Sequence, residues 1–216
     1  MHIVVAGASG ATGRHVVEQA ARAGHRVTAL VRDPGRYDPP DAVTTLRADV
    51  ARDPAIPLPP DTDAVISALG KRSPRDPEST CMLGIIHLAA AMRAVDTRRI
   101  VVTSAQPVLR SGAGLNALDR HVLTPLIRLW GRRIYPDLER MEAYLHSQGE
   151  YLDWTVLRPG YLRDEDKPGT FRLELDRNVP GSTFRPDLAA ALLEVTGDES
   201  TYGRTYGISS RTRSGV

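Results

Sequence analysis

Short apolar runs alternate with helix-type periodicity along the first half of the chain. In the segments Gly13 to Ala23 and Ser79 to Ala94, apolar residues recur three and four positions apart, which predicts helices with one buried face. The apolar runs are nearly uninterrupted, as in strands that a parallel sheet buries on both faces. They are His2 to Ala6, Arg26 to Val31, Val43 to Leu46, Asp63 to Leu69 and Arg99 to Thr103. Their alternation with helices predicts right-handed βαβ units and a parallel sheet covered on both sides.

The second half of the chain has a looser pattern. Two helical segments, Leu115 to Trp130 and Leu138 to Ser147, are expected to be interrupted at Pro125 and between residues 131 and 136. Earlier, four prolines between Pro54 and Pro60 predict a helix that is short or missing. The remaining predicted elements are strands at Trp154 to Leu157, Phe171 to Leu175 and Arg204 to Ile208, and a helix at Asp187 to Thr196.

Composition narrows the class of protein. A chain of 216 residues with a net charge of +2 and no long run of Lys or Arg fits one globular domain with no nucleic-acid partner. No apolar stretch approaches a membrane span, so we expect no membrane partner and a cytoplasmic protein, monomeric or weakly homo-oligomeric. Cys81, the single cysteine, is expected to be a buried, inert thiol, and the six histidines lack metal-site spacing.

Three glycines close the first strand and open the first helix. Gly7, Gly10 and Gly13 allow tight turns and a close approach of phosphate, and the helix that follows offers free N–H groups and a positive dipole. We therefore expect a dinucleotide pyrophosphate at this loop. Its predicted contacts include Ser9, Ala11 and Thr12 as well as the glycines.

The residue after the second strand indicates which dinucleotide is bound. Arg32 stands where NAD-binding proteins carry a carboxylate, and an arginine there suits the 2′-phosphate of NADP(H). Arg36 and Arg14 extend this basic cradle. Further cofactor contacts are expected at the ends of the next strands. Asp49 and Val50 would meet the adenine, and Ala68, Leu69 and Gly70 would line the middle of the cofactor. Thr103 and Pro159 are the remaining predicted contacts.

These features lead to one fold prediction. We expect an α/β fold with a Rossmann-like, doubly wound parallel sheet and a small C-terminal lobe on the substrate side. Residues 1–216 would form a single NAD(P)-binding domain, with substrate-side elements mainly at 105–135 and 159–186.

Several motifs together resemble a known family. The loop of Gly7 to Gly13 resembles the G-x-x-G-x-x-G loop of atypical short-chain dehydrogenase/reductases. The motifs Leu30 to Pro34, Ala48 to Val50, Val101 to Ala105 and Trp154 to Gly160 are similar to the NAD(P)H-binding, NmrA-like branch, and most of all to its biliverdin reductase B/flavin reductase type. The resemblance covers nearly the whole chain. It implies NADPH binding and a shallow pocket for planar conjugated acceptors.

The usual proton donor of short-chain dehydrogenases is missing. No tyrosine has a lysine four residues later, and the two lysines, Lys71 and Lys167, are both expected in loops. The resemblance places Ser104 beside the nicotinamide, where a hydroxyl can orient a carbonyl or carboxamide or merely cap the strand. Tyr161 comes shortly after Pro159, which follows the predicted strand Trp154 to Leu157; the biliverdin/flavin reductase type has a histidine at this position. We expect Tyr161 to assist as an acid or as a stacking ring, or to be structural.

The predicted function is therefore NADPH-dependent hydride transfer to a quinone, a flavin or an aromatic polyketide-like intermediate, with Ser104 and Tyr161 as catalytic residues. Two alternatives stay open: a non-catalytic NADP(H)-binding redox sensor, and an isomerase or cyclase that reuses the fold.

Overall fold

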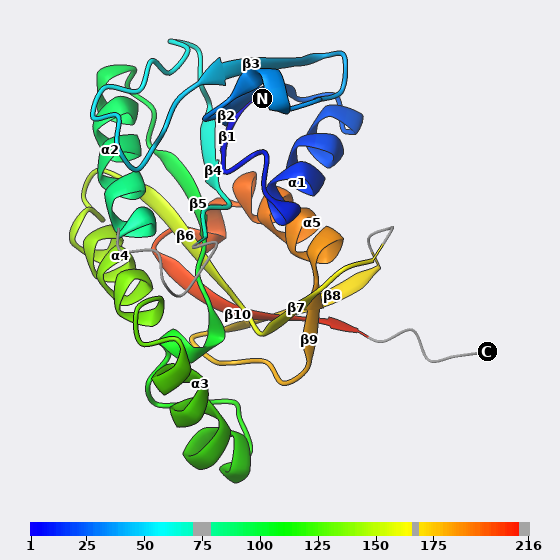
Figure 1. Cartoon of the computed structure of the whole chain (residues 1–216), viewed down its shortest axis with the longest axis vertical. Helices are drawn as coiled ribbons and strands as arrows, with labels where there is room; N and C mark the ends of the chain where they lie inside the picture. Colours follow the sequence, from blue (N-terminus) through cyan, green and yellow to red (C-terminus); the bar gives the residue numbers. More distant parts are fainter. Residues whose placement is uncertain (71–78, 166–168, 212–216) are drawn as a thin grey trace.

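The computed structural model describes residues 1–70, 79–165 and 169–211. Both lysines, Lys71 and Lys167, lie outside these ranges. Within them, eight strands form one central sheet in the order β3-β2-β1-β4-β5-β6-β10-β8, flanked by helices on both faces (Figure 1). Its strands are β1 (His2–Ala6), β2 (Arg26–Val31), β3 (Val43–Arg47), β4 (Ala64–Ser67), β5 (Arg99–Thr103), β6 (Asp153–Pro159), β8 (Thr170–Leu175) and β10 (Arg204–Arg211).

All neighbouring strands of this sheet are parallel except β8, which runs antiparallel to β10 at one edge. The chain leaves β1 towards β2 and β3 on one side and returns to β4, β5 and β6 on the other. The switch point, where such sheets bind ligands beyond the carboxyl ends of their strands, therefore lies between β1 and β4. The predicted doubly wound parallel sheet is confirmed.

Helices cover both faces of the sheet, and the alternation of side chains along each strand divides the core into two layers. Ile3 and Val5 belong to the layer under α1 and α5, whereas Val4 and Ala6 belong to the layer under α2 and α4 (Figure 1). The helices are α1 (Ala11–Arg22), α2 (Thr80–Ala94), α3 (Thr124–Trp130), α4 (Tyr135–Ser147) and α5 (Arg185–Thr196). Four short helical turns complete the set: η1 (Pro34–Arg36), η2 (Gln106–Val108), η3 (Asp119–Leu123) and η4 (Glu199–Thr201).

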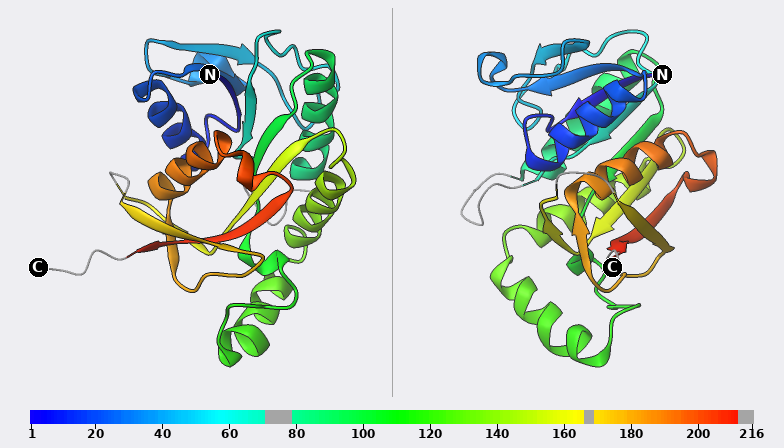
Figure 2. Two further views of the ribbon diagram at one scale, coloured as in Figure 1. Left: turned by 180° about the vertical axis from the view of Figure 1, so that it is seen from behind. Right: turned by 90° about the vertical axis from the view of Figure 1, so that its right-hand side faces the viewer.

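The region from Leu115 to Trp130, expected to be helical with an interruption at Pro125, changes its helix type next to that proline. It contains the π-helical turn η3 followed directly by α3, and Pro125 lies in the first turn of α3. Together η3 and α3 project from the end of the molecule opposite the N-terminus (Figures 1 and 2).

A second, two-stranded sheet was not predicted. It pairs β7 (Tyr161–Arg163) with β9 (Ser182–Phe184) in parallel. Each strand has only three residues, too few for a hydrophobic period to be read from the sequence. No regular helix is present between residues 54 and 60, as the prolines predicted.

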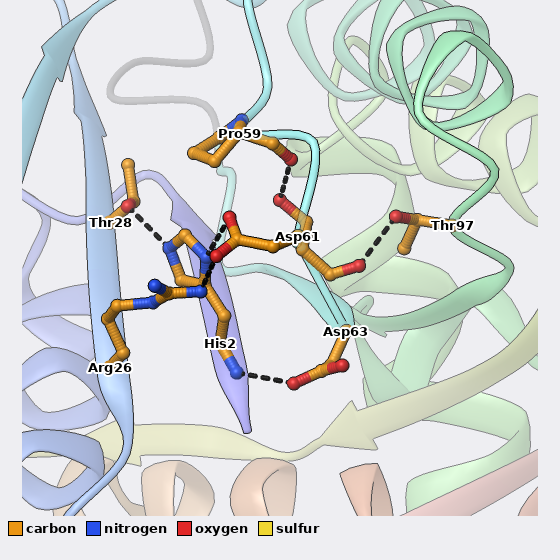
Figure 3. A network of polar contacts seen from close by, with 8 residues as sticks. His2, Arg26, Thr28, Pro59, Asp61, Asp63 and Thr97 are labelled. Carbon is orange, nitrogen blue, oxygen red and sulfur yellow. Dashed lines mark hydrogen bonds and ion pairs between the residues drawn. The ribbon is translucent and has the colours of Figure 1, made fainter.

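A polar network closes the amino ends of β1 and β2, far from their carboxyl ends (Figure 3). The His2 imidazole lies 2.8 Å from the Thr28 hydroxyl and 3.1 Å from one carboxylate oxygen of Asp61, whose other oxygen pairs with Arg26. The backbone N–H of His2 donates to Asp63 at 2.6 Å. Burial and, to a lesser extent, the charge of Arg26 hold the pKa of His2 below its ordinary value.

Candidate functional site

The glycine loop is packed so tightly that side chains cannot replace two of its glycines. Gly7 has φ +79°, and a Cβ there would lie 2.7 Å from the carbonyl oxygen of Ala68. A Cβ on Gly13 would collide with the carbonyl oxygen of Gly7. The N–H of Gly10 donates to that same carbonyl at 2.9 Å and closes the turn. The loop therefore brings the backbone of β1, α1 and the end of β4 together.

The N-terminus of α1 is left open for an anion. Its N-cap, Gly10, supplies no side-chain hydrogen bond, and the first turn contains no acidic residue. The first-turn N–H groups and the positive end of the helix dipole are therefore available to a phosphate. Glycines that a Cβ would obstruct, beside an uncapped helix start, fit the pyrophosphate of a dinucleotide.

A cavity of about 480 Å³ begins at this loop and follows the carboxyl edge of the sheet. Most of the residues predicted to bind cofactor or substrate line it. They are Gly7, Ser9, Gly10, Ala11, Thr12, Arg32, Asp49, Val50, Ala68, Leu69, Gly70, Thr103 and Ser104.

Besides Arg14, four predicted site residues do not line the cavity. Gly13 lies beneath the loop and packs on Gly7. Arg36 is exposed and pairs with Asp33 at 3.3 Å. Pro159 is buried as the last residue of β6, and Tyr161 is 77% exposed, whereas its neighbour Leu162 lines the cavity.

Of the three arginines predicted to form the basic cradle, Arg32 alone lines the cavity. It makes no ion pair with another residue in the described part of the chain. The guanidinium of Arg14 lies 5.8 Å from the centre of the Tyr37 ring instead. Arg32 is therefore the cation that a 2′-phosphate at this end of the cavity would meet.

The opposite end of the cavity is bounded by Ser104, which follows β5. Its hydroxyl donates to Glu142 of α4 at 2.5 Å, and the same carboxylate oxygen accepts from Nε of Arg158 at 3.0 Å. A second nitrogen of Arg158 pairs with the other oxygen of Glu142. All three residues are buried. Because the hydroxyl hydrogen is directed at Glu142, the lone pairs of Ser104 are the part available to a ligand.

Sequence reasoning left Glu142 without a role, because its partners lie 38 and 16 positions away along the chain. One signal could have indicated it: Glu142 lies one helical turn after the apolar Leu138, so its carboxylate falls on the buried face of α4. A charge on a buried helix face needs a partner.

The wall beside Ser104 is mainly apolar. Ile134, Leu138 and Leu162 line it, together with Arg185, which pairs with Asp164 at 2.6 Å. Cys81 also borders the cavity, and its side chain is buried, as predicted. Its N–H donates to Asp137, which caps the start of α2.

Tyr135, next to Ile134 of this wall, is not activated as an acid. Burial raises the pKa of Tyr135, although the charge of Arg128 opposes the shift. In the described ranges, no group of three or more His, Cys, Asp or Glu side chains could hold a metal ion. None of the helices described is both long and apolar enough to cross a membrane.

The fold and the loop define a dinucleotide-binding protein of the Rossmann type. Residues 7–199 match the model of the NAD(P)H-binding family, and the chain belongs to that family. This confirms the predicted nicotinamide cofactor and the resemblance to atypical short-chain dehydrogenase/reductases.

Three individual proteins that resemble this chain share less than 30% of its sequence. The Arabidopsis thaliana protein At2g34460, described as chloroplastic, is 28% identical over 215 residues, which cover 93% of this chain and 74% of the relative. SP1627 of Streptococcus pneumoniae, a putative NADH-flavin reductase, superimposes with a TM-score of 0.76 at 20% identity, over 98% of this chain and all of that chain. ChuY of Escherichia coli O157:H7, an anaerobillin reductase, gives a TM-score of 0.73 at 18% identity over both whole chains.

Proposed function

We propose that this protein is an NADPH-dependent reductase that transfers a hydride to a planar conjugated acceptor: a quinone, a flavin or an aromatic polyketide-like intermediate. One observation carries the proposal. A single cavity runs from the anion-binding glycine loop, past Arg32, to Ser104 and an apolar wall. The same cavity therefore has a place for each end of a dinucleotide and an apolar surface where an acceptor can lie.

The preference for NADPH rests on Arg32. It lines the cavity after β2, and no neighbouring acid in the described chain neutralises it. A guanidinium forms strong, charge-assisted hydrogen bonds with a phosphate and has no comparable interaction with a free ribose hydroxyl.

The bound nicotinamide would supply the hydride from its C4 atom. The protein's own contribution is to orient and to exclude water. Ser104, held by Glu142, presents an acceptor to an N–H or O–H group of the ligand, and Ile134, Leu138 and Leu162 provide an apolar contact for a flat ring. Tyr161 is exposed in the present arrangement, so solvent is the proton source that the proposal assigns.

The relatives support the choice of first acceptors. SP1627 is described as a putative NADH-flavin reductase, which makes a flavin the first acceptor to test. A quinone shares the flat, conjugated shape that the apolar wall favours.

A steady-state assay tests the proposal. We expect NADPH oxidation with at least one member of a panel of FMN, menadione and other naphthoquinones. Gly13→Ala, which places a Cβ against the Gly7 carbonyl, should weaken NADPH binding; Gly197→Ala, in open space after α5 and with φ −90°, is the control for substituting a glycine. Tight NADPH binding without turnover of any acceptor would contradict reduction and favour the redox-sensing alternative.

A further inference from the structure

The helical segment at the far end of the molecule has its apolar side chains facing solvent. The segment comprises η3 and α3 with Leu118 before them, and its exposed side chains range from 43% exposure for Ile127 to 73% for Trp130. We call these residues the apolar face. They are Leu118, Val122, Leu123, Leu126, Ile127, Leu129 and Trp130.

Two polar side chains of the same segment, Thr124 and Arg128, face the protein. Thr124 is buried, and Arg128 donates to the Pro107 carbonyl at 2.5 Å and pairs with Glu139 at 2.7 Å. The amphipathic pattern is thus the reverse of that in an ordinary surface helix, which turns its apolar side to the core. A contiguous apolar surface of this kind marks a site of association.

The charges around the apolar face indicate what covers it. Between residues 115 and 135 the chain has four arginines and one acid, Asp119, which is bonded to Asn116. Arg120, His121 and Arg132 are exposed beside the apolar side chains. Two copies of the chain meeting through this face would bring Arg120 and Arg132 of one copy towards those of the other, whereas an anionic surface would pair with both arginines.

We propose that the apolar face docks on an anionic lipid bilayer, with Trp130 and the leucines in the interface and with Arg120 and Arg132 against lipid headgroups. Apolar side chains with a tryptophan, flanked by cations, are the pattern of helices that lie in the plane of a membrane surface. The projection of η3 and α3 from the body lets them reach a surface without obstruction (Figures 1 and 2).

This inference departs from the expectation of no membrane partner, which was based only on the lack of an apolar stretch long enough to span a membrane. Surface binding requires one amphipathic face and no span. The inference does not depend on the proposed reductase activity, because no residue of the apolar face lines the cavity.

Sedimentation with vesicles tests the inference on the full chain. We expect binding to vesicles of equal parts phosphatidylcholine and phosphatidylglycerol, weak binding to phosphatidylcholine alone, and release by salt. Trp130 fluorescence should shift to shorter wavelength on binding, since the second tryptophan, Trp154, is already buried. The double variant Leu126→Ser and Leu129→Ser should bind at least about tenfold more weakly, whereas Leu175→Ser, an exposed leucine of β8, should bind like the wild type.

Two results would overturn the inference. One is equal sedimentation of wild type and the double variant with the anionic vesicles. The other is a wild type that does not sediment with vesicles but forms a concentration-dependent dimer in light scattering, when the double variant does not. A second copy of the chain would then cover the apolar face.

Discussion

Single residues of the site differ in how far the sequence could predict them. The positions of Gly7, Gly10 and Arg32 at the cavity could be predicted because these residues lie next to a strand end, within a few residues of chain. The role of Glu142 could not, because it arises from tertiary packing that brings α4 against β5 and β6. The sequence suggested Ser104 as a hydrogen-bond donor to a ligand; in the structure its hydrogen is directed at Glu142.

Replacement of Arg32 should change the choice of nucleotide. We expect Arg32→Ala to weaken NADPH binding by about tenfold to a hundredfold, the value of a lost charge-assisted hydrogen bond or two, and to leave NADH binding nearly unchanged. Fluorescence titration of both nucleotides measures this. Arg36→Ala is the matched control, because Arg36 pairs with Asp33 and does not line the cavity. Equal weakening of NADPH and NADH would refute the 2′-phosphate assignment.

His2 should make the stability of the protein depend on pH. Burial and the charge of Arg26 lower the pKa of the folded imidazole, so below a pH of about 6.5 the unfolded chain binds a proton that the folded chain does not. The free energy of unfolding should therefore fall as the pH falls below that value, and remain at its full value above it.

Denaturant unfolding at a series of pH values measures this contribution. His2→Gln should flatten the profile between pH 6.5 and the lowered pKa, while His121→Gln, at an exposed position on η3, should leave it unchanged. A profile that His2→Gln does not alter would show that other groups control it.

At the scale of elements, length decided what could be predicted. The bounds of β1, β2 and β5 agree with the predicted runs, because nearly uninterrupted apolar runs of five or six residues suit strands that a parallel sheet buries on both faces. The strand predicted from Asp63 to Leu69 is shorter in the structure, Ala64–Ser67. The carboxylate of Asp63 accepts a hydrogen bond from the His2 N–H, and Leu69 lines the cavity. The π turn of η3 has no sequence signature that distinguishes it from an α-helix.

The contact between α4 and β6 gives a test of stability. Glu142→Ala leaves Arg158 as a buried, unpaired charge and should lower the free energy of unfolding by about 3–5 kcal/mol. Replacing both partners, Glu142→Leu with Arg158→Met, should recover most of that loss, because no unpaired charge remains.

Urea denaturation provides the comparison. The control for this helix is Arg110→Ala, which removes one ion pair of Glu139: Arg110 is exposed and Glu139 keeps its second partner, Arg128, so the loss should be much smaller. A double variant as unstable as Glu142→Ala would show that shape, and not charge, makes this contact important.

At the scale of the whole molecule, the doubly wound sheet and the position of the site followed from the order of elements. Strands that alternate with helices place every strand's carboxyl end at one edge, where the glycine loop, Arg32 and Ser104 meet. The reversed face of η3 and α3 could not be foreseen, because the periodicity of a helix shows that it has an apolar side but not which way that side points.

Anaerobic single-turnover oxidation of bound NADPH by menadione tests the central claim most directly. Hydride transfer in the cavity predicts one equivalent of NADPH oxidised per site, more slowly when the transferred C4 hydrogen is deuterium, with Ser104→Ala reducing the rate without abolishing nucleotide binding. NADPH that stays reduced on the protein, or is oxidised at a rate that neither deuterium nor Ser104→Ala changes, would contradict it.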